Sequence, residues 1–133
     1  MIHPTEAELC IESTLESSHF LPHVEDTHRC RKAHGHSFLV KIFVLGVVTP
    51  DHVAFPDSGM VMDYDVVLRS WQILHGQLDH TTLNLVPGLE NPTCENISLW
   101  ILQRMPAFVT AISVGTGLVG GLRASATVRR SGP

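Results

Sequence analysis

The sequence contains no apolar run of the roughly 18 residues that a membrane-spanning helix needs, so it predicts no transmembrane segment. It also has little concentrated positive charge. The 9 Lys and Arg residues are outnumbered by 13 Asp and Glu residues, the formal net charge is -4, and no basic stretch is longer than RCRK. General binding of nucleic acid needs a concentrated basic face. We therefore expect neither a membrane nor a nucleic acid as a partner.

Cysteine is scarce and odd in number. Cys10, Cys30 and Cys94 cannot all be paired within the chain, which argues against a disulfide framework. The first ten residues, MIHPTEAELC, carry acidic residues and no basic segment, unlike a secretory signal peptide. These features predict a protein of the reducing cytoplasm.

The 133 residues contain no internal repeat and no low-complexity segment. Apolar residues make up 44% of the chain and charged residues 17%, which is typical of a globular protein. A chain of this length is most simply one domain. It buries roughly two-thirds of its unfolded surface, so it can form a core without disulfides.

The hydrophobic pattern predicts strands in the first half of the chain. Residues 37–48, SFLVKIFVLGVV, are rich in β-branched and aromatic side chains and predict a strand. Residues 9–18, LCIESTLESS, can run antiparallel beside it. Residues 49–59 hold two prolines and a glycine and predict a connection, after which MVMDY (60–64) predicts a short strand.

Helical spacing of apolar residues follows. Residues 63–77 predict a helix with Asp63 or Asp65 as its N-cap, and Thr93 opens a second helix over 93–105. Residues 84–92 between them predict a loop, and a last segment covers 111–121. Strands followed by helices indicate an α+β fold rather than an alternating parallel sheet.

The segment HRCRKAHGHSF (28–38) collects the chain's clearest metal-ligand pattern. On a strand, residues two apart point to one face, so His34 and His36 can aim two imidazoles at one point, with Gly35 leaving room between them. A third histidine would complete an open, catalytic type of zinc site. The alternative is a solvated strand edge with no metal. His19, His23 and His28 are all candidates for the third ligand.

Cys30 lies four residues before His34, next to Arg29, Arg31 and Lys32. These cations favour the thiolate form. Cys30 could be a fourth zinc ligand, a base or nucleophile, or an inert side chain, and its polar surroundings weigh against the last. Cys10 and Cys94 have apolar or helical settings and are expected to be structural.

The tripeptide LDH (78–80) is a second candidate site. An Asp adjacent to a His can orient it as an acid or base, so Asp79 and His80 could form a proton-transfer pair. Taken alone, the tripeptide also fits an ordinary surface turn.

Five motifs now occur in one order. They are SSHFLPHV (17–24), Cys-x-x-x-His-Gly-His (30–36), GMVMDY (59–64), LDHTTLN (78–84) and PGLENPTCEN (87–96). Together, over about residues 12–114, they resemble the bacterial 6-carboxy-5,6,7,8-tetrahydropterin synthases of queuosine (7-deazaguanine) biosynthesis, close relatives of the 6-pyruvoyl-tetrahydropterin synthases. The resemblance implies a tunnelling fold (T-fold): a four-stranded antiparallel sheet with two antiparallel helices on one face. It also implies a homohexamer built from two trimeric barrels, with sites shared between subunits.

The resemblance further implies the roles of individual residues. It assigns Zn²⁺ to His19, His34 and His36, and the general base to Cys30. Asp79 and His80 would be the acid/base dyad, supplied by a neighbouring subunit, and Thr93 and Glu95 would line the pterin pocket. The implied substrate is 7,8-dihydroneopterin triphosphate, converted to 6-carboxytetrahydropterin, acetaldehyde and triphosphate. The three-residue gap between Cys30 and His34 favours this carboxy branch over the pyruvoyl branch.

The C-terminus departs from the family. The family's last strand reads V-x-V-x-E-T, and its Glu anchors the pterin by charge-assisted hydrogen bonds. Thr116 stands at that position here, and no acidic residue follows Glu95. We therefore expect one synthase domain over 1–114 and a divergent tail over 115–133 in place of the last strand. STLESSHF (13–20) also replaces the usual FxFEAAHR.

Three functions are open at this stage: an active zinc lyase of pterin metabolism, a zinc-binding relative with impaired catalysis because the anchoring Glu is absent, and a metal-binding structural domain. The set Cys30, Asp79 and His80 separates the first from the third, since metal storage needs no acid or base. The missing Glu separates the first from the second.

Overall fold

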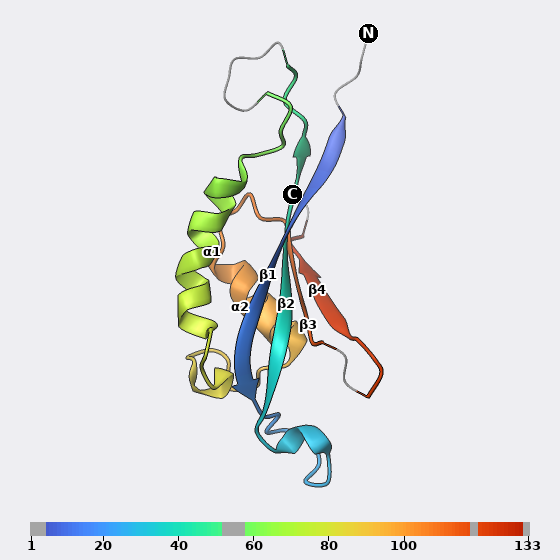
Figure 1. The fold of residues 1–133 in the computed structure, drawn as a ribbon, viewed down its shortest axis with the longest axis vertical. Coiled ribbons are helices and arrows are strands. Elements are labelled where there is room, and N and C mark those ends of the chain that lie inside the picture. Colours follow the sequence, from blue (N-terminus) through green and yellow to red (C-terminus); the bar gives the residue numbers. More distant parts are fainter. Residues whose placement is uncertain (1–4, 52–57, 118–119, 132–133) are drawn as a thin grey trace.

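The computed structural model describes residues 5–51, 58–117 and 120–131 and shows a four-stranded antiparallel sheet with two helices (Figure 1). This confirms the predicted α+β class. The strands lie in the order β1-β2-β3-β4, with both helices between β2 and β3 in sequence. The elements are β1 (Glu6–His19), η1 (Arg29–Arg31), β2 (His34–Val47), α1 (Tyr64–Leu78), η2 (Leu83–Leu85), α2 (Cys94–Arg104), β3 (Ala111–Gly115) and β4 (Ser125–Arg129).

The long pair of β1 and β2 positions the candidate site. The register runs from Glu6 opposite Val47 to His19 opposite His34, without a break. The predicted strand over 37–48 is therefore confirmed and extended to His34, and the segment 9–18 does run antiparallel beside it. This register brings the third candidate histidine, His19, directly across from His34 at the end of the pair.

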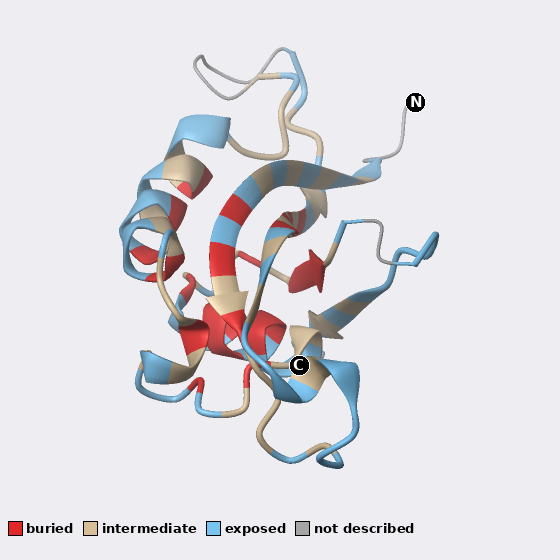
Figure 2. Cartoon of the chain, turned by 60° about the horizontal axis from the view of Figure 1, so that its bottom comes forward, coloured by how far each residue is buried: buried red, intermediate tan, exposed pale blue. Residues whose placement is uncertain are grey.

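One face of the sheet carries the core. Alternate side chains of β1 and β2, such as Leu15, Phe38 and Val40, are fully buried, as two-residue periodicity requires. They pack in one cluster with the buried faces of α1 and α2. Figure 2 shows this buried layer between the sheet and the helices. His34 and His36 stand on the same face as Phe38, where the sheet extends past the core.

Both helices begin at the predicted caps. The Asp63 carboxylate accepts a hydrogen bond from the Asp65 amide (2.9 Å), and the Thr93 hydroxyl accepts one from the Asn96 amide (3.1 Å). Each cap satisfies a backbone N–H that has no partner within the helix. Thr93 and Glu95 are thereby fixed at the start of α2.

The prediction of a short strand at 60–64 was wrong. The Met60 carbonyl accepts a hydrogen bond from the Thr49 amide (2.9 Å), after a turn at Gly59 with φ of 78°. The chain then leaves the sheet for the helix layer, because only Val61 and Met62 separate this turn from the N-cap of α1. Their side chains pack against the core instead. The predicted connection 49–59 lies partly outside the described residues.

The C-terminal segment forms a strand of the sheet. Residues 125–129 make β4, which pairs with all of β3 from Ala111 opposite Arg129 to Gly115 opposite Ser125. Arg130 then holds the end of α2: its guanidinium donates to the carbonyls of Leu102 (2.9 Å), Met105 (3.0 Å) and Val109 (2.6 Å). The proposed boundary at residue 114 stays a prediction.

Two expectations from composition can be compared with the described part of the chain. No helix in it is long and apolar enough to cross a membrane. All three cysteines are free thiols, whereas their odd number alone required only one of them to be unpaired. Cys10 is exposed, however, so its predicted apolar setting was wrong.

Candidate metal and catalytic site

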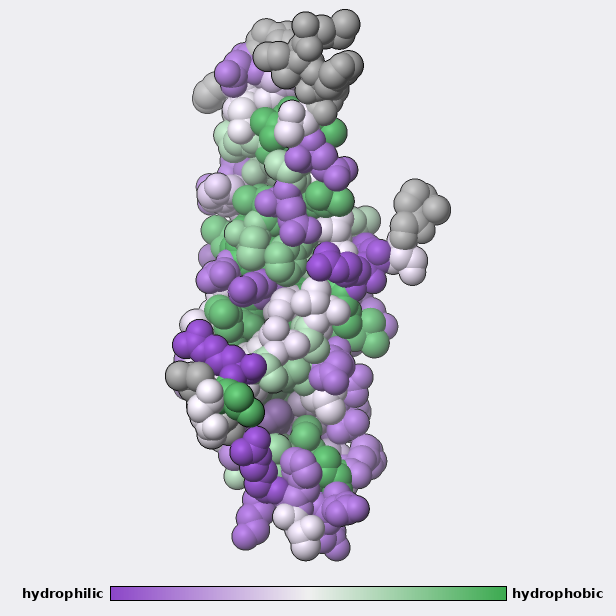
Figure 3. Space-filling model, turned by 90° about the vertical axis from the view of Figure 1, so that its right-hand side faces the viewer, coloured by the Kyte–Doolittle hydropathy of each residue, from purple (hydrophilic) through white to green (hydrophobic). Residues whose placement is uncertain are grey.

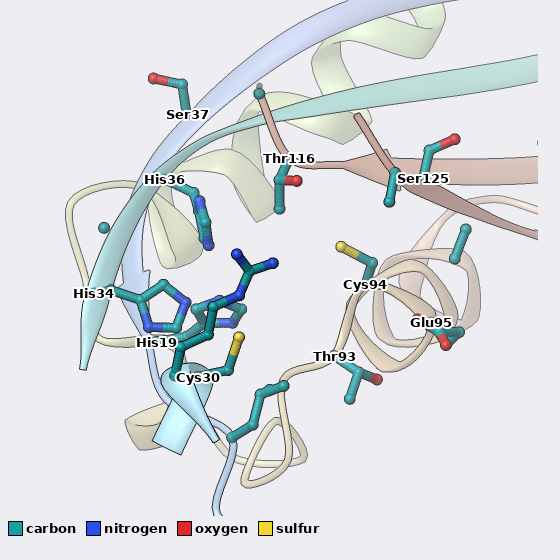
Figure 4. Close-up of a pocket in the computed structure, with 16 residues that line it drawn as sticks. His19, Cys30, His34, His36, Ser37, Thr93, Cys94, Glu95, Thr116 and Ser125 are labelled. Atoms are coloured by element: carbon teal, nitrogen blue, oxygen red, sulfur yellow. The ribbon is translucent and has the colours of Figure 1, made fainter. Parts of the chain in front are cut away.

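Three imidazoles converge at the end of β1 and β2 (Figure 4). One ligand nitrogen of each of His19, His34 and His36 lies within 4.8 Å of the other two. The ring centroids are 4.6, 5.1 and 4.7 Å apart, and the rings meet edge to face. Phe38 forms an apolar floor, with its centroid 5.2 Å from those of His19 and His36. Of the three candidates for the third ligand, only His19 joins this cluster in the described chain.

The outer hydrogen bonds fix which nitrogens are free. His19 Nδ1 lies 2.8 Å from the Pro92 carbonyl, and His34 Nδ1 lies 2.7 Å from the Lys32 carbonyl. A carbonyl only accepts, so both Nδ1 atoms carry the proton and both Nε2 lone pairs remain available. Backbone partners of this kind orient metal-bound histidines. The donor set therefore fits Zn²⁺ or a similar cation.

Two of the imidazoles, those of His19 and His36, favour the neutral, metal-binding form. Burial lowers the pKa of His19, against the opposing effect of its Pro92 hydrogen bond. Burial also lowers the pKa of His36 to about 4, and the charges of His19, His34 and Arg29 add to this.

Gly35 was expected to leave room between His34 and His36, but the structure does not require a glycine there. A Cβ built there would meet only the Ser17 carbonyl, at 4.0 Å, which is ordinary contact. The close approach of His34 and His36 therefore follows from strand geometry and does not depend on a glycine between them.

Cys30 shares a pocket of about 1000 Å³ with the three histidines. It sits in the turn η1, where its amide donates to His28 Nδ1 (3.0 Å) and its carbonyl accepts from the Leu21 amide (2.8 Å). Its thiol points into the pocket (Figure 4) but is not part of the three-nitrogen cluster. Three close nitrogen ligands leave a fourth coordination position open, as in catalytic metal sites, and the Cys30 thiol lies near it without closing it.

The far wall of the pocket is built by α2, β3 and β4. Thr93 and Glu95 line it as predicted, together with Cys94, Thr116 and Ser125. Cys94 was expected to be structural, but its thiol faces the pocket. Burial raises the pKa of this thiol to about 11, with a contribution from Glu95, which favours the neutral thiol over the nucleophilic thiolate.

Asp79 and His80 lie together, but apart from this pocket. His80 Nδ1 is 2.7 Å from Asp79 Oδ2, and Asp79 Oδ1 accepts a hydrogen bond from the Glu16 amide (2.9 Å). The pair follows α1 at the outer edge of β1, and neither residue lines the pocket. Hydrogen bonding to Glu16 and then His80 lowers the pKa of Asp79, so its carboxylate is charged and orients the imidazole.

Several residues that line the pocket were not predicted from the sequence. Arg29 lines the pocket, although the sequence showed only a cation next to Cys30. Cys94 lines it too, and its position between Thr93 and Glu95, which were both predicted to line the pocket, could have indicated this. The small wall residues Ala124 and Ala126 had no signal, because their segment predicted no strand.

Comparisons with known proteins agree with this geometry. A family model described as 6-pyruvoyl tetrahydropterin synthase matches residues 8–116. The chain is 38% identical over 97 residues to a 6-carboxy-5,6,7,8-tetrahydropterin synthase of Synechocystis, which is 71% of this chain and 70% of the relative. It is 34% identical over 116 residues to the Bacillus subtilis protein of the same name, 83% of this chain and 73% of that one. A dihydroneopterin monophosphate aldolase of Pyrococcus furiosus is 33% identical over 86 residues, 62% of this chain and 64% of the aldolase.

Solved structures share the fold. The 6-pyruvoyl tetrahydropterin synthase of Caenorhabditis elegans superposes with a TM-score of 0.75 at 17% identity, covering 98% of this chain and 100% of that one. The Plasmodium vivax protein of the same name gives 0.61 at 19% identity, covering 95% of this chain and 99% of that one. The match to the family model covers most of the chain, so this chain belongs to the 6-pyruvoyl tetrahydropterin synthase family.

Proposed function

We propose that the chain is a zinc-dependent 6-carboxy-5,6,7,8-tetrahydropterin synthase that acts in queuosine biosynthesis. It would convert 7,8-dihydroneopterin triphosphate to 6-carboxytetrahydropterin, acetaldehyde and triphosphate. The observation that carries the proposal is the cluster of His19, His34 and His36 beside the Cys30 thiol in one pocket. Relatives that bear this name at 33–38% identity support the carboxy branch.

His19, His34 and His36 would hold the metal, leaving an open position for the substrate side chain. Zinc bound there would act as a Lewis acid that lowers the pKa of the side-chain hydroxyls. Cys30 would move a proton at the pterin ring carbon, and His80, oriented by Asp79, would move protons on the side chain. Thr93 and Glu95 would hold the pterin. Because Asp79 and His80 do not line this chain's pocket, the dyad would come from a second copy in a homo-oligomer, which the family resemblance implies to be a hexamer.

The decisive experiment is to incubate the purified, zinc-loaded protein with 7,8-dihydroneopterin triphosphate and to identify the products by mass. We expect the carboxypterin together with acetaldehyde. A pyruvoyl product that retains all side-chain carbons would assign the pyruvoyl branch instead. Stoichiometric zinc with no product would support a family member with impaired catalysis, for which the absent C-terminal Glu is the reason.

The metal part of the proposal has its own test. We expect one zinc per chain, lost in the His34→Ala and His36→Ala proteins, because two imidazoles make a poor site. The Cys30→Ala protein should keep its zinc and lose turnover. His23→Ala is the matched control, since His23 lies outside the cluster. Zinc loss on Cys30→Ala would show a closed, structural site and would remove the support for catalysis.

A further inference from the structure

The turn η1 presents two guanidinium groups in different surroundings. The Arg31 guanidinium has partners close to the turn: its Nη1 donates a hydrogen bond to the Val24 carbonyl (2.6 Å) and lies 3.3 Å from the Asp26 carboxylate. Arg29, two residues earlier, lines the large pocket. In the described chain, no carboxylate lies within ion-pair distance of Arg29, and no hydrogen bond of its side chain is formed.

Arg29 is the one permanent cation among the described residues that line the pocket. The acidic residue of the lining, Glu95, lies on α2 on the far wall and makes no ion pair with Arg29. Arg29 and the histidine cluster line the same pocket. One side of the pocket therefore combines an unpaired guanidinium with a metal-type site, and the other side is neutral or acidic.

An unpaired guanidinium beside a metal-type site suits a ligand with several anionic oxygens. The planar fork of arginine binds phosphate oxygens through two parallel hydrogen bonds, which a lysine cannot do. We propose that Arg29 binds the phosphate chain of the substrate and sets the preference of this pocket for a phosphorylated side chain. This inference rests on the proposed function, since that function supplies a triphosphate ester as substrate and free triphosphate as product.

The contact would exist both before and after the phosphate is released. An interaction of similar strength in the ground state and in the transition state raises affinity without raising turnover. Replacement of Arg29 should therefore raise KM for the triphosphate ester and leave kcat nearly unchanged. The same residue should bind inorganic triphosphate, which makes the inference testable without any turnover.

Binding of inorganic triphosphate is measured first, by calorimetry on the purified protein, with zinc content determined before and after so that stripping of the metal is detected. Arg29→Ala should weaken binding about ten- to a hundredfold, as expected for charge-assisted hydrogen bonds. Arg29→Lys should recover part of the loss. Lys32→Ala is the matched control: it removes the same charge from the end of the same turn, but Lys32 does not line the pocket, so binding should change less than threefold.

Substrate analogues then isolate the phosphate contribution. The Arg29→Ala change should raise KM for 7,8-dihydroneopterin triphosphate by a similar factor, raise that for the monophosphate less, and leave the binding of unphosphorylated 7,8-dihydroneopterin unchanged. Equal losses for all three ligands would overturn the inference and show a general disturbance of the pocket, as would equal triphosphate binding by the Arg29→Ala and natural proteins. If the protein binds triphosphate through Arg29 but makes no pterin product, the proposed function fails and the anion site stands.

Discussion

His80 has the one left-handed backbone among the described residues other than glycine, with φ of 55°. Such a conformation is costly for a residue with a side chain and persists where its surroundings enforce it. Here the His80 amide donates to the Glu16 carbonyl (2.6 Å), while the Asp79 carboxylate binds both the Glu16 amide and the His80 ring. The edge of β1 thus fixes the backbone, and Asp79 fixes the imidazole, with its Nε2 left for a ligand.

The first residue-scale prediction concerns pH. The folded-state pKa of Asp79 lies below its usual value, so its hydrogen bonds stabilise the fold at pH values above the unfolded pKa of about 3.9. That contribution is lost as pH falls through the lower, folded pKa. The difference in unfolding free energy between the natural protein and Asp79→Asn should therefore be smaller at pH 3 than at pH 5. Urea titrations between these two pH values measure it. A difference that grows as pH falls from 5 to 3 would contradict the assigned sign.

The second residue-scale prediction concerns Thr116, which lines the pocket together with small, neutral residues such as Gly117 and Ala124. A pterin presents a fork of N–H donors, and each buried donor without an acceptor costs roughly 1–3 kcal/mol. Thr116→Glu should supply the missing acceptor and raise kcat/KM at least tenfold, because about 1.4 kcal/mol is a factor of ten.

Thr116→Gln is its control, since it adds similar bulk without charge and should gain much less. Steady-state assays with 7,8-dihydroneopterin triphosphate compare the three proteins. If the natural protein is already fully active and Thr116→Glu changes nothing, another group anchors the pterin and the alignment of this segment is wrong.

Residue spacing alone predicted part of the site. Two-residue periodicity placed His34 and His36 on one face, but it left His19, His23 and His28 as candidates for the third ligand. The choice of His19 depends on the β1–β2 register, a long-range feature that the family resemblance supplied. Arg29 could not be assigned from spacing, because a turn gives no periodic direction to its side chains, and Arg31 beside it turns out to be paired with Asp26.

At the scale of elements, local sequence patterns predicted the strands and helices that they dominate, but not those that depend on contacts between distant parts of the chain. The β-branched run of β2 and the capped, amphipathic pattern of α1 and α2 predicted where these elements begin and end to within a few residues. The stretch 60–64 has strand-like composition, yet it is too short between a turn and an N-cap to stay in the sheet. Conversely, β4 reads SATVR, which carries no clear strand signal, and it forms because β3 offers it an edge and Arg130 holds its end.

Arg130 gives the element-scale prediction. Its guanidinium donates to four backbone carbonyls around the end of α2, and the fourth, Pro106, lies at 3.2 Å. Arg130→Ala removes the side-chain donor from all four carbonyls, of which Leu102 and Pro106 keep a backbone donor, and should lower the free energy of unfolding by about 1–3 kcal/mol. Chemical denaturation measures this.

Arg129→Ala is the neighbouring control. Arg129 is exposed and lies 3.9 Å from Glu8, so its removal should cost less than about 1 kcal/mol. Equal losses for the two variants would mean that Arg130 does not hold β4 against α2.

At the scale of the whole molecule, the described sheet has two open edges. Along β1, the backbone N–H and C=O groups of the even-numbered residues point away from β2. The chain segment 79–82 pairs with those of Glu16 and Ser18, but in the described chain Glu8, Cys10 and Glu12 form no backbone hydrogen bond on that side. On the other side, β4 pairs only with β3. The side of the molecule turned to the viewer in Figure 3 mixes hydrophobic and hydrophilic patches. Open edges of this kind favour pairing with a further strand.

The pocket reaches across the sheet from His19 at the end of β1 to a far wall lined by Ser125 and Ala126 of β4. Asp79 and His80 lie outside this pocket, at the outer edge of β1. If β1 of one copy pairs with β4 of the next, the dyad of the first copy approaches the pocket of the second. Neither chain would then hold a complete site by itself.

Mixing two inactive variants tests this sharing of sites. Cys30→Ala removes the proposed base and His80→Ala removes the proposed acid, so each protein alone should be inactive. After subunit exchange under mild denaturant, mixed oligomers should regain part of the activity, because some interfaces combine an intact Cys30 with an intact His80. The double variant Cys30→Ala/His80→Ala, exchanged with the natural protein, measures the loss expected from dilution alone, and size-exclusion chromatography with light scattering follows the assembly. A mixture of the two single variants that stays inactive, although exchange is shown to occur, would place all of the catalytic groups within one chain.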